Sequence, residues 1–200
     1  MKKLSLFLLF LATQAFTQTK TADLTFKLLP DKSQIIWQGS PVVGGGHQGT
    51  MIVSAGNLIT FPDGKVKGGN FIIDMNSIVN TDIKDEKGRK NLADHLKSED
   101  FFDTKRFPVA NFAITKVIAS AKPNEYTVTG NLTLRGSTNA IVFPATIYQD
   151  KTQIKAQGRI SIDRTRWGVT YKAYNFLSQM KENMISNEIK IAVDLVFAKQ

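Results

Sequence analysis

Residues 124–163 read NEYTVTGNLTLRGSTNAIVFPATIYQDKTQIKAQGRISID, and three consecutive segments of this stretch alternate apolar and polar side chains. Because neighbouring residues of a strand point to opposite faces, a period of two indicates a sheet with one buried face. The polar links at residues 136–138 and 149–151 are short, which favours antiparallel hairpins over crossover connections. The predicted buried face consists of Tyr126, Val128, Gly130, Leu132, Leu134, Ile141, Phe143, Ala145, Ile147, Ile154, Ala156, Gly158, Ile160 and Ile162.

The same alternation predicts strands at residues 24–28, 33–39, 47–53, 57–61, 65–78, 109–118 and 189–197. Residues 91–102 are predicted to be helical, after a charged loop at 80–90. A strand end at 167–171 is followed by an amphipathic turn or short helix carrying Ala173, Leu177, Met180 and Met184. Eight or nine strands with short turns favour an all-β protein, an antiparallel barrel of about eight strands with one or two short helices. Such a barrel is filled by side chains or holds one small ligand.

The first seventeen residues are predicted to be a secretory signal peptide. Lys2 and Lys3 precede about nine apolar residues, and small residues follow, so cleavage is expected after Ala15 or Thr17. The apolar run is too short to span a bilayer, which takes about 20 residues. We expect residues 18–200 to form a single domain that is periplasmic or secreted. Because the chain contains no cysteine, the core alone must stabilise this domain.

The chain is basic, with a formal charge of +9 at pH 7, and the removal of Lys2 and Lys3 lowers it to +7. The basic residues are scattered apart from a cluster at 84–90, and the sequence has no basic helix or stacking motif, so nucleic-acid binding is not expected. Two interpretations of the charge remain open: a solvated cationic surface, and a weak, transient contact with an anionic membrane surface.

The sequence offers little catalytic or metal-binding chemistry. His47 and His95 lack the spacing of a zinc site, even if Asp94 or Asp100 served as a further ligand. No cysteine and no Gly-x-Ser-x-Gly motif supplies a nucleophile. We therefore expect no metal, no cofactor and no enzymatic activity, and we expect His95 to anchor the helix by hydrogen bonding into the barrel.

Four separated motifs resemble those of one protein family. They are residues 69–71 leading into 74–78, the block 94–103 followed by Arg106, Phe107, Pro108 and Phe112, residues 130–136, and residues 162–165. In this order and spacing they resemble the YceI-like lipid- and polyisoprenoid-binding family of bacterial envelope proteins, over roughly residues 32–197. Many relatives carry an Arg-Asp pair before the histidine, where this chain has Leu92 and Ala93.

The resemblance implies a lipocalin-like, extended barrel whose apolar pore holds an isoprenoid chain, such as a polyprenyl lipid or a quinone tail. Inward aromatic residues also serve as ordinary core, and both interpretations remain open for each of them. The residues predicted to contact the ligand are Trp37, Phe71, Ile73, Phe112, Ile114, Tyr126, Val128, Leu132, Phe143, Ile160, Trp167 and Tyr171. Candidates for contact with its head group are Asn70, Arg164 and Tyr171.

The predicted function is the non-enzymatic binding, sequestration or transport of an isoprenoid or other long apolar lipid. The first alternative is an envelope stress or interaction protein whose barrel is filled by its own side chains. The second is an enzyme that acts on a lipid inside the pocket.

Overall fold

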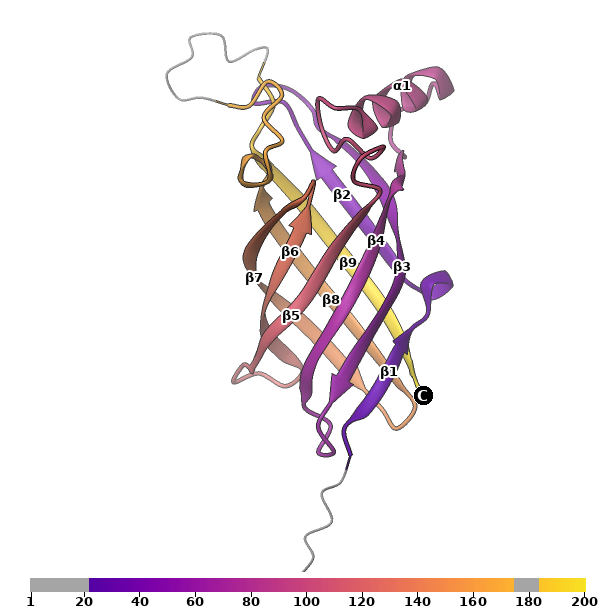
Figure 1. The fold of residues 1–200 in the computed structure, drawn as a ribbon, viewed down its shortest axis with the longest axis vertical. Helices are drawn as coiled ribbons and strands as arrows, with labels where there is room; N and C mark the ends of the chain where they lie inside the picture. Colours follow the sequence, from indigo (N-terminus) through magenta and orange to yellow (C-terminus); the bar gives the residue numbers. More distant parts are fainter. Residues whose placement is uncertain (1–21, 175–183) are drawn as a thin grey trace, which may run out of the picture.

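The computed structural model describes residues 22–174 and 184–200, which form a closed β-barrel with a helix at one end (Figure 1). We call the end near the helix the upper end and the opposite end, near the C-terminus, the lower end. The helix α1 spans Glu86–Lys97, and two 3₁₀ helices span Pro30–Lys32 and Arg164–Trp167. The strands are β1 (Leu24–Leu28), β2 (Gln34–Gly39), β3 (His47–Thr60), β4 (Val66–Asn80), β5 (Val109–Ala119), β6 (Glu125–Leu134), β7 (Ser137–Gln149), β8 (Gln153–Asp163) and β9 (Glu188–Lys199).

Nine strands fill eight positions of the barrel, because β1 and β2 share one position. Both pair antiparallel with β3 on one side and with β9 on the other, and the 3₁₀ helix that begins at Pro30 separates them. From β9 the order continues through β8, β7, β6, β5 and β4, and β4 pairs with β3 to close the ring. The predicted antiparallel barrel of about eight strands is confirmed.

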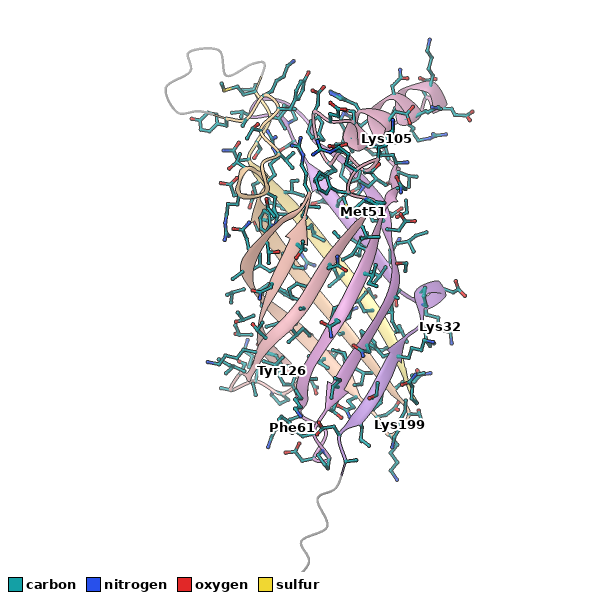
Figure 2. The ribbon with its side chains drawn as sticks, viewed as in Figure 1. Lys32, Met51, Phe61, Lys105, Tyr126 and Lys199 are labelled. Atoms are coloured by element: carbon teal, nitrogen blue, oxygen red, sulfur yellow. The ribbon has the colours of Figure 1, made fainter. Side chains whose placement is uncertain are left out.

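The alternating stretch forms β6, β7 and β8, and its apolar residues face inward as predicted. On β7, Ile141 and Phe143 are buried, whereas the intervening Val142 is 64% exposed. Charged side chains such as Lys32 and Lys199 lie on the outer surface (Figure 2). The barrel core is therefore built from every second residue of each strand.

The lower end of the barrel is packed shut by side chains. Leu28 of β1, Phe197 of β9 and Ile154 of β8 are paired across three neighbouring strands, and Phe26 lies beside them. All four are buried, and Phe197 and Ile154 have no exposed surface. Access to the interior must therefore come from elsewhere.

The prediction of two separate strands at 47–53 and 57–61 was wrong, because β3 runs without a break from His47 to Thr60. The pairing of β3 with β4 shifts register between Val53 and Ala55, which marks a bulge. Gly56 follows this bulge, and a Cβ at that position would lie 2.9 Å from the Phe71 ring. The small residues at 55–56 thus accommodate a close contact inside a strand rather than a turn.

The helix boundaries were also predicted incorrectly, since α1 begins at Glu86 instead of Asn91 and ends at Lys97 instead of Phe102. The Asp85 side chain caps the helix by accepting a hydrogen bond from the Gly88 backbone N–H at 2.7 Å. Residues 86–91 of the helix carry no large apolar side chain, so the hydrophobic pattern begins more than one turn after the helix does.

The prediction of a strand end at 167–171 was wrong, because Trp167 belongs to the 3₁₀ helix Arg164–Trp167 and residues 168–171 form turns and irregular backbone. Gly168 ends this helix in the left-handed region, at a φ of 73°. The predicted signal peptide, and Leu177 and Met180 of the predicted amphipathic segment, lie outside the described residues. Within residues 22–174 and 184–200, no helix combines the length and the hydropathy needed to cross a membrane.

Candidate functional site

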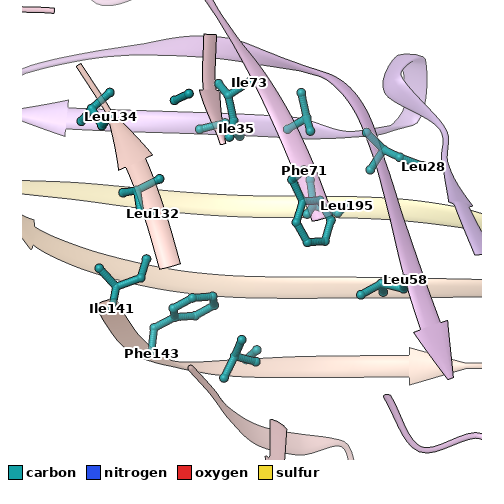
Figure 3. Close-up of a cluster of buried hydrophobic side chains, with 14 of the residues drawn as sticks. Leu28, Ile35, Leu58, Phe71, Ile73, Leu132, Leu134, Ile141, Phe143 and Leu195 are labelled. Carbon is teal, nitrogen blue, oxygen red and sulfur yellow. The ribbon is translucent and has the colours of Figure 1, made fainter. Parts of the chain in front are cut away.

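A cavity of about 300 Å³ lies inside the barrel, with walls contributed by every strand from β2 to β9. Its lining is almost entirely aliphatic and aromatic. Figure 3 shows Phe71, Phe143 and Leu195 as part of the buried cluster that surrounds this space. Apolar walls hold water poorly, and small-molecule sites begin at roughly this volume, so the cavity suits an apolar ligand.

Three phenylalanine rings shape the cavity wall. Phe71 stacks on Phe112 at a centroid distance of 6.1 Å, and Phe112 lies 5.7 Å from Phe143. Glycines opposite them provide the room: a Cβ on Gly130 would lie 2.3 Å from Phe112, and one on Gly158 would lie 3.2 Å from Phe143. The small inward residue at 130 therefore accommodates a ring and does not widen the cavity.

The structure brings most of the predicted ligand-contact residues together on the cavity wall: Trp37, Phe71, Ile73, Phe112, Ile114, Val128, Leu132, Phe143 and Ile160. Three of them lie elsewhere. Tyr126 is half-buried against the core near the lower end. Trp167 is buried outside the cavity wall, and its Nε1–H donates to the Leu132 carbonyl at 2.9 Å. Tyr171 packs against the rings of His95 and Phe101 at the upper end.

Several residues that line the cavity were not among those predicted from the sequence. On β9 these are Ile189, Ile191, Val193 and Leu195, and further lining residues include Met51 and Met75. The clean alternation of the last strand was recognised, and it was sufficient to place the β9 residues on the inner face.

The upper end is covered by α1 and the turns that follow it. Leu92 and Leu96 lie four residues apart on the helix, and both line the cavity together with Phe101 and Phe102. These apolar side chains form one side of the cavity roof. Leu92 thus has an apolar role in the roof of the cavity.

An aromatic cluster connects α1 and the turn after it to Tyr171, which follows the second 3₁₀ helix. The His95 ring meets Phe101 and Tyr171 edge-on, each at a centroid distance of 5.0 Å. Its Nε2 also lies 3.0 Å from a carboxylate oxygen of Asp100. His95 therefore ties α1 to the turn after it, whereas the prediction was a hydrogen bond into the barrel.

Arg164 lies buried at the upper end and donates to four backbone carbonyls. The acceptors are Val169 at 2.8 Å, Tyr171 and Ser186 at 3.0 Å, and Ile185 at 3.2 Å. Burial lowers the pKa of this guanidinium from its ordinary value. Arginine nevertheless stays protonated in proteins, with five N–H donors. Since four carbonyls occupy most of these donors, Arg164 fixes the rim instead of presenting a free cation to a ligand.

The prediction that Asn70 lies at the mouth of the barrel was wrong. Its side chain is exposed on the outer face of β4, where its neighbour across the ladder is Asn57. The upper end of that strand is at Asn80, ten residues further along the chain.

The cavity reaches the surface at the upper rim, beside the end of β2. Its lining there includes Gly39, Ser40, His47 and Glu188, of which the last two are exposed. The same four residues also line a second pocket of about 300 Å³, whose remaining lining residues are Gln38, Gly46, Gln48, Asp82 and Lys190. We call this second pocket the rim recess. Because the two spaces share lining residues, we treat them as contiguous.

The carboxylate of Asp82, in the rim recess, has two side-chain partners. It accepts a hydrogen bond from the Asn80 side-chain amide, and its other oxygen lies 3.1 Å from Nδ1 of His47. Burial raises the pKa of Asp82, but hydrogen bonds from Asn80, His47 and the Gln48 backbone outweigh burial, so the pKa lies below its ordinary value of 3.8. Asp82 is therefore ionised at neutral pH.

No metal site is visible in the part of the chain that the structure describes, since no three potential ligands among its His, Asp and Glu side chains gather closely enough to hold an ion. The two histidines are each paired with a single carboxylate, Asp82 for His47 and Asp100 for His95.

Comparison with known proteins agrees with this architecture. The model of the YceI-like domain matches residues 26–197. The UPF0312 protein plu2095 of Photorhabdus laumondii is 27% identical over 113 residues, which are 52% of this chain and 53% of that protein. The match thus spans about half the length of that relative.

Solved structures show the same fold at low sequence identity. BcnA of Burkholderia cenocepacia superposes with a TM-score of 0.66 at 22% identity, covering 84% of this chain and 98% of BcnA. A polyisoprenoid-binding domain from Saccharophagus degradans gives a TM-score of 0.61 at 16% identity, covering 88% and 99%. The YCEI protein of Campylobacter jejuni gives 0.51 at 20% identity, covering 68% and 74%.

Proposed function

Because the chain belongs to the YceI-like family, we propose that it binds one long apolar lipid of the isoprenoid type inside its barrel and carries or sequesters that lipid without converting it. The observation that carries this proposal is the cavity, whose walls are apolar on every strand from β2 to β9 and which opens at the upper rim. A closed lower end and an open upper rim would hold an extended chain with one end near the surface.

Burial of the chain accounts for useful affinity without any catalytic group. Each buried methylene contributes about 0.8 kcal/mol, so about ten of them contribute roughly 8 kcal/mol. That free energy corresponds to a dissociation constant of about 1 μM before the cost of ordering the ligand is subtracted. A carrier that must also release its ligand needs no tighter binding.

The choice of an isoprenoid chain is supported by a structural neighbour. The neighbour from Saccharophagus degradans is described as a polyisoprenoid-binding domain, and it shares this barrel over most of its length. Branched isoprenoid chains also suit walls of mixed aliphatic and aromatic residues, such as Ile73, Phe112 and Leu132.

We further propose that the protein is exported and acts in the cell envelope, with transient contact with the membrane surface during lipid exchange. This part rests on the predicted signal peptide at residues 1–17 and on the basic charge of the chain. Cell fractionation, combined with N-terminal sequencing of the mature protein, tests it. Full-length protein confined to the cytoplasm would refute it.

The cavity favours lipid binding over the alternative of a barrel filled by its own side chains, because the described side chains leave about 300 Å³ unfilled. Native mass spectrometry of protein purified without detergent from its own cells separates the two. One bound isoprenoid-like species per chain supports the proposal. A ligand-free mass, with no uptake of added quinone or polyprenol, would favour the filled barrel.

A pair of variants links any bound mass to the cavity. Ala156 lines the cavity, and Ala156→Phe should fill the space and abolish lipid uptake. Ala192 is exposed on β9, so Ala192→Phe adds the same ring on the outer face and should leave uptake unchanged. Equal lipid loads in both variants would place the lipid outside the barrel.

A further inference from the structure

The rim recess differs in chemistry from the cavity that it adjoins. The cavity offers almost no polar group, whereas the rim recess is lined by two glutamine amides, one imidazole, two carboxylates and one ammonium group. A lipid whose tail enters the cavity from the upper rim would leave its head beside Gly39, Ser40 and His47, where the two spaces meet.

His47 lines this recess, and its contact with Asp82 determines which ring nitrogen carries the proton. Its Nδ1 faces the ionised carboxylate of Asp82 at 3.1 Å, and a carboxylate can only accept, so Nδ1 carries the shared proton. In the neutral imidazole, Nε2 is then an acceptor. The Asp82 contact thus fixes the tautomer of His47, and it leaves Nε2 suited to a hydroxyl group that donates.

The charges of the rim recess disfavour an anionic head. Asp82 and Glu188 are both carboxylates, and the one ammonium, that of Lys190, already lies 3.7 Å from Glu188. A phosphate or diphosphate would therefore face two negative groups. Sites for such heads gather arginine and lysine donors around the oxygens instead.

An unpartnered donor lies just below the rim recess. Trp37 is buried, lines the cavity and is two residues from Gly39 on β2. Its Nε1–H has no hydrogen-bond partner among the described residues. A buried donor without a partner is rare and costly, and a ligand oxygen near the rim would provide an acceptor. The upper rim of the cavity therefore offers a donor, Nε1–H of Trp37, and an acceptor, Nε2 of His47.

From this combination we infer that the rim recess is a head-group site that selects an uncharged, hydroxyl-bearing head, such as a prenol-type alcohol, over a phosphorylated one. The inference rests on the proposed function, because the tail of the same ligand occupies the cavity. It assigns to His47 and Asp82 a role in specificity, while the apolar walls supply the affinity.

Three probes with one isoprenoid tail test the inference: geranylgeraniol, its methyl ether and geranylgeranyl diphosphate. Affinities are measured by titration calorimetry on the delipidated protein. The wild type should bind the alcohol about tenfold more tightly than the ether, because the ether cannot donate to Nε2. The diphosphate should bind no more tightly than the ether.

Substitution of His47 tests whether this residue is responsible for the preference for the alcohol. His47→Phe should reduce the alcohol-to-ether ratio to about one, and its circular dichroism spectrum should match that of the wild type, which shows that the variant is folded. The matched control is His95→Phe, because His95 forms the other histidine–carboxylate pair, 3.0 Å from Asp100, and lines neither space. This control should keep the wild-type ratio.

The outcomes separate the inference from the proposed function. Binding of all three probes with equal affinity, tightest binding of the diphosphate, or an unchanged ratio in His47→Phe would overturn the inference alone. If the wild type takes up none of the three probes, the proposed function fails and the inference fails with it.

Discussion

A Cβ built on Gly130 would lie 2.3 Å from Cζ of Phe112, so the inner face of β6 has no room for a side chain at this position. The same Cβ would lie 2.6 Å from the Ala113 carbonyl oxygen, and rotation of the phenylalanine ring cannot relieve that second contact. The close approach of β5 and β6 at this point thus depends on glycine.

We expect Gly130→Ala to destabilise the protein by about 1–3 kcal/mol, the usual cost of overpacking a core. The measurement is the urea midpoint of unfolding. Gly68→Ala is the control, because its Cβ would meet only the Ile114 carbonyl oxygen, at an ordinary 3.7 Å. The control should be as stable as the wild type or slightly more stable. Equal midpoints for the two variants would contradict the close approach.

Arg164→Gln should destabilise the rim strongly, because four carbonyls lose the guanidinium that now satisfies them. Loss of hydrogen bonds to a buried charged group suggests a cost of roughly 3 kcal/mol. In a chain of this length, that corresponds to a fall in Tm of roughly 6–12 °C. Arg159→Gln changes an exposed arginine on β8 and should leave Tm nearly unchanged. A loss below about 1 kcal/mol in Arg164→Gln would show that other contacts hold the rim.

Asp150 makes the turn between β7 and β8 sensitive to acid. Its carboxylate accepts hydrogen bonds from the Thr152 backbone N–H at 2.7 Å, the Gln153 backbone N–H at 2.8 Å and the Thr152 hydroxyl at 2.9 Å. These bonds, led by the one from the Thr152 backbone, hold the pKa of Asp150 below its ordinary value of 3.8. Because the folded pKa is the lower one, the stabilisation is complete above the unfolded pKa and is lost as pH falls through the folded pKa.

Asp150→Asn should therefore lower Tm at pH 7 and make Tm decline less than in the wild type between about pH 4.5 and 2. Thermal unfolding across this pH range gives both quantities. Asp31→Asn removes an exposed carboxylate that has no hydrogen-bond partner among the described residues, and it should keep the wild-type decline. Parallel Tm curves for Asp150→Asn and the wild type would contradict the assignment.

The sequence predicted the barrel because its strongest signal, the alternation from residue 124 to residue 163, is a local property of each strand. The sharing of one barrel position by β1 and β2 is not local. It depends on the pairing of Leu28 with Phe197 and of Trp37 with Ile191, across most of the chain. No pattern within residues 24–39 indicates such a pairing. The sequence therefore predicts the two strands but not their shared position in the barrel.

The residues of the cavity wall could be predicted where they follow from the local alternation of a strand, and not where they depend on contacts between distant segments. Inward positions such as Phe71 and Phe143 follow from alternation, whereas the rim recess depends on loops and strand ends. His47 and Asp82 are far apart in the sequence and meet only because β3 begins where β4 ends. Among the head-group candidates chosen from the sequence, Asn70 faces outward, whereas Arg164 lines the cavity but uses most of its donors for backbone carbonyls.

The two tryptophans of the chain provide a direct test of where the lipid lies. Trp37 lines the cavity, whereas Trp167 is buried outside the cavity wall and donates to the Leu132 carbonyl. Trp167→Phe leaves Trp37 as the sole reporter, and addition of a polyprenol should then shift its emission. In Trp37→Phe, where only Trp167 remains, the same addition should change little. A larger response from Trp167 would place the lipid beside the 3₁₀ helix Arg164–Trp167 and not within the barrel.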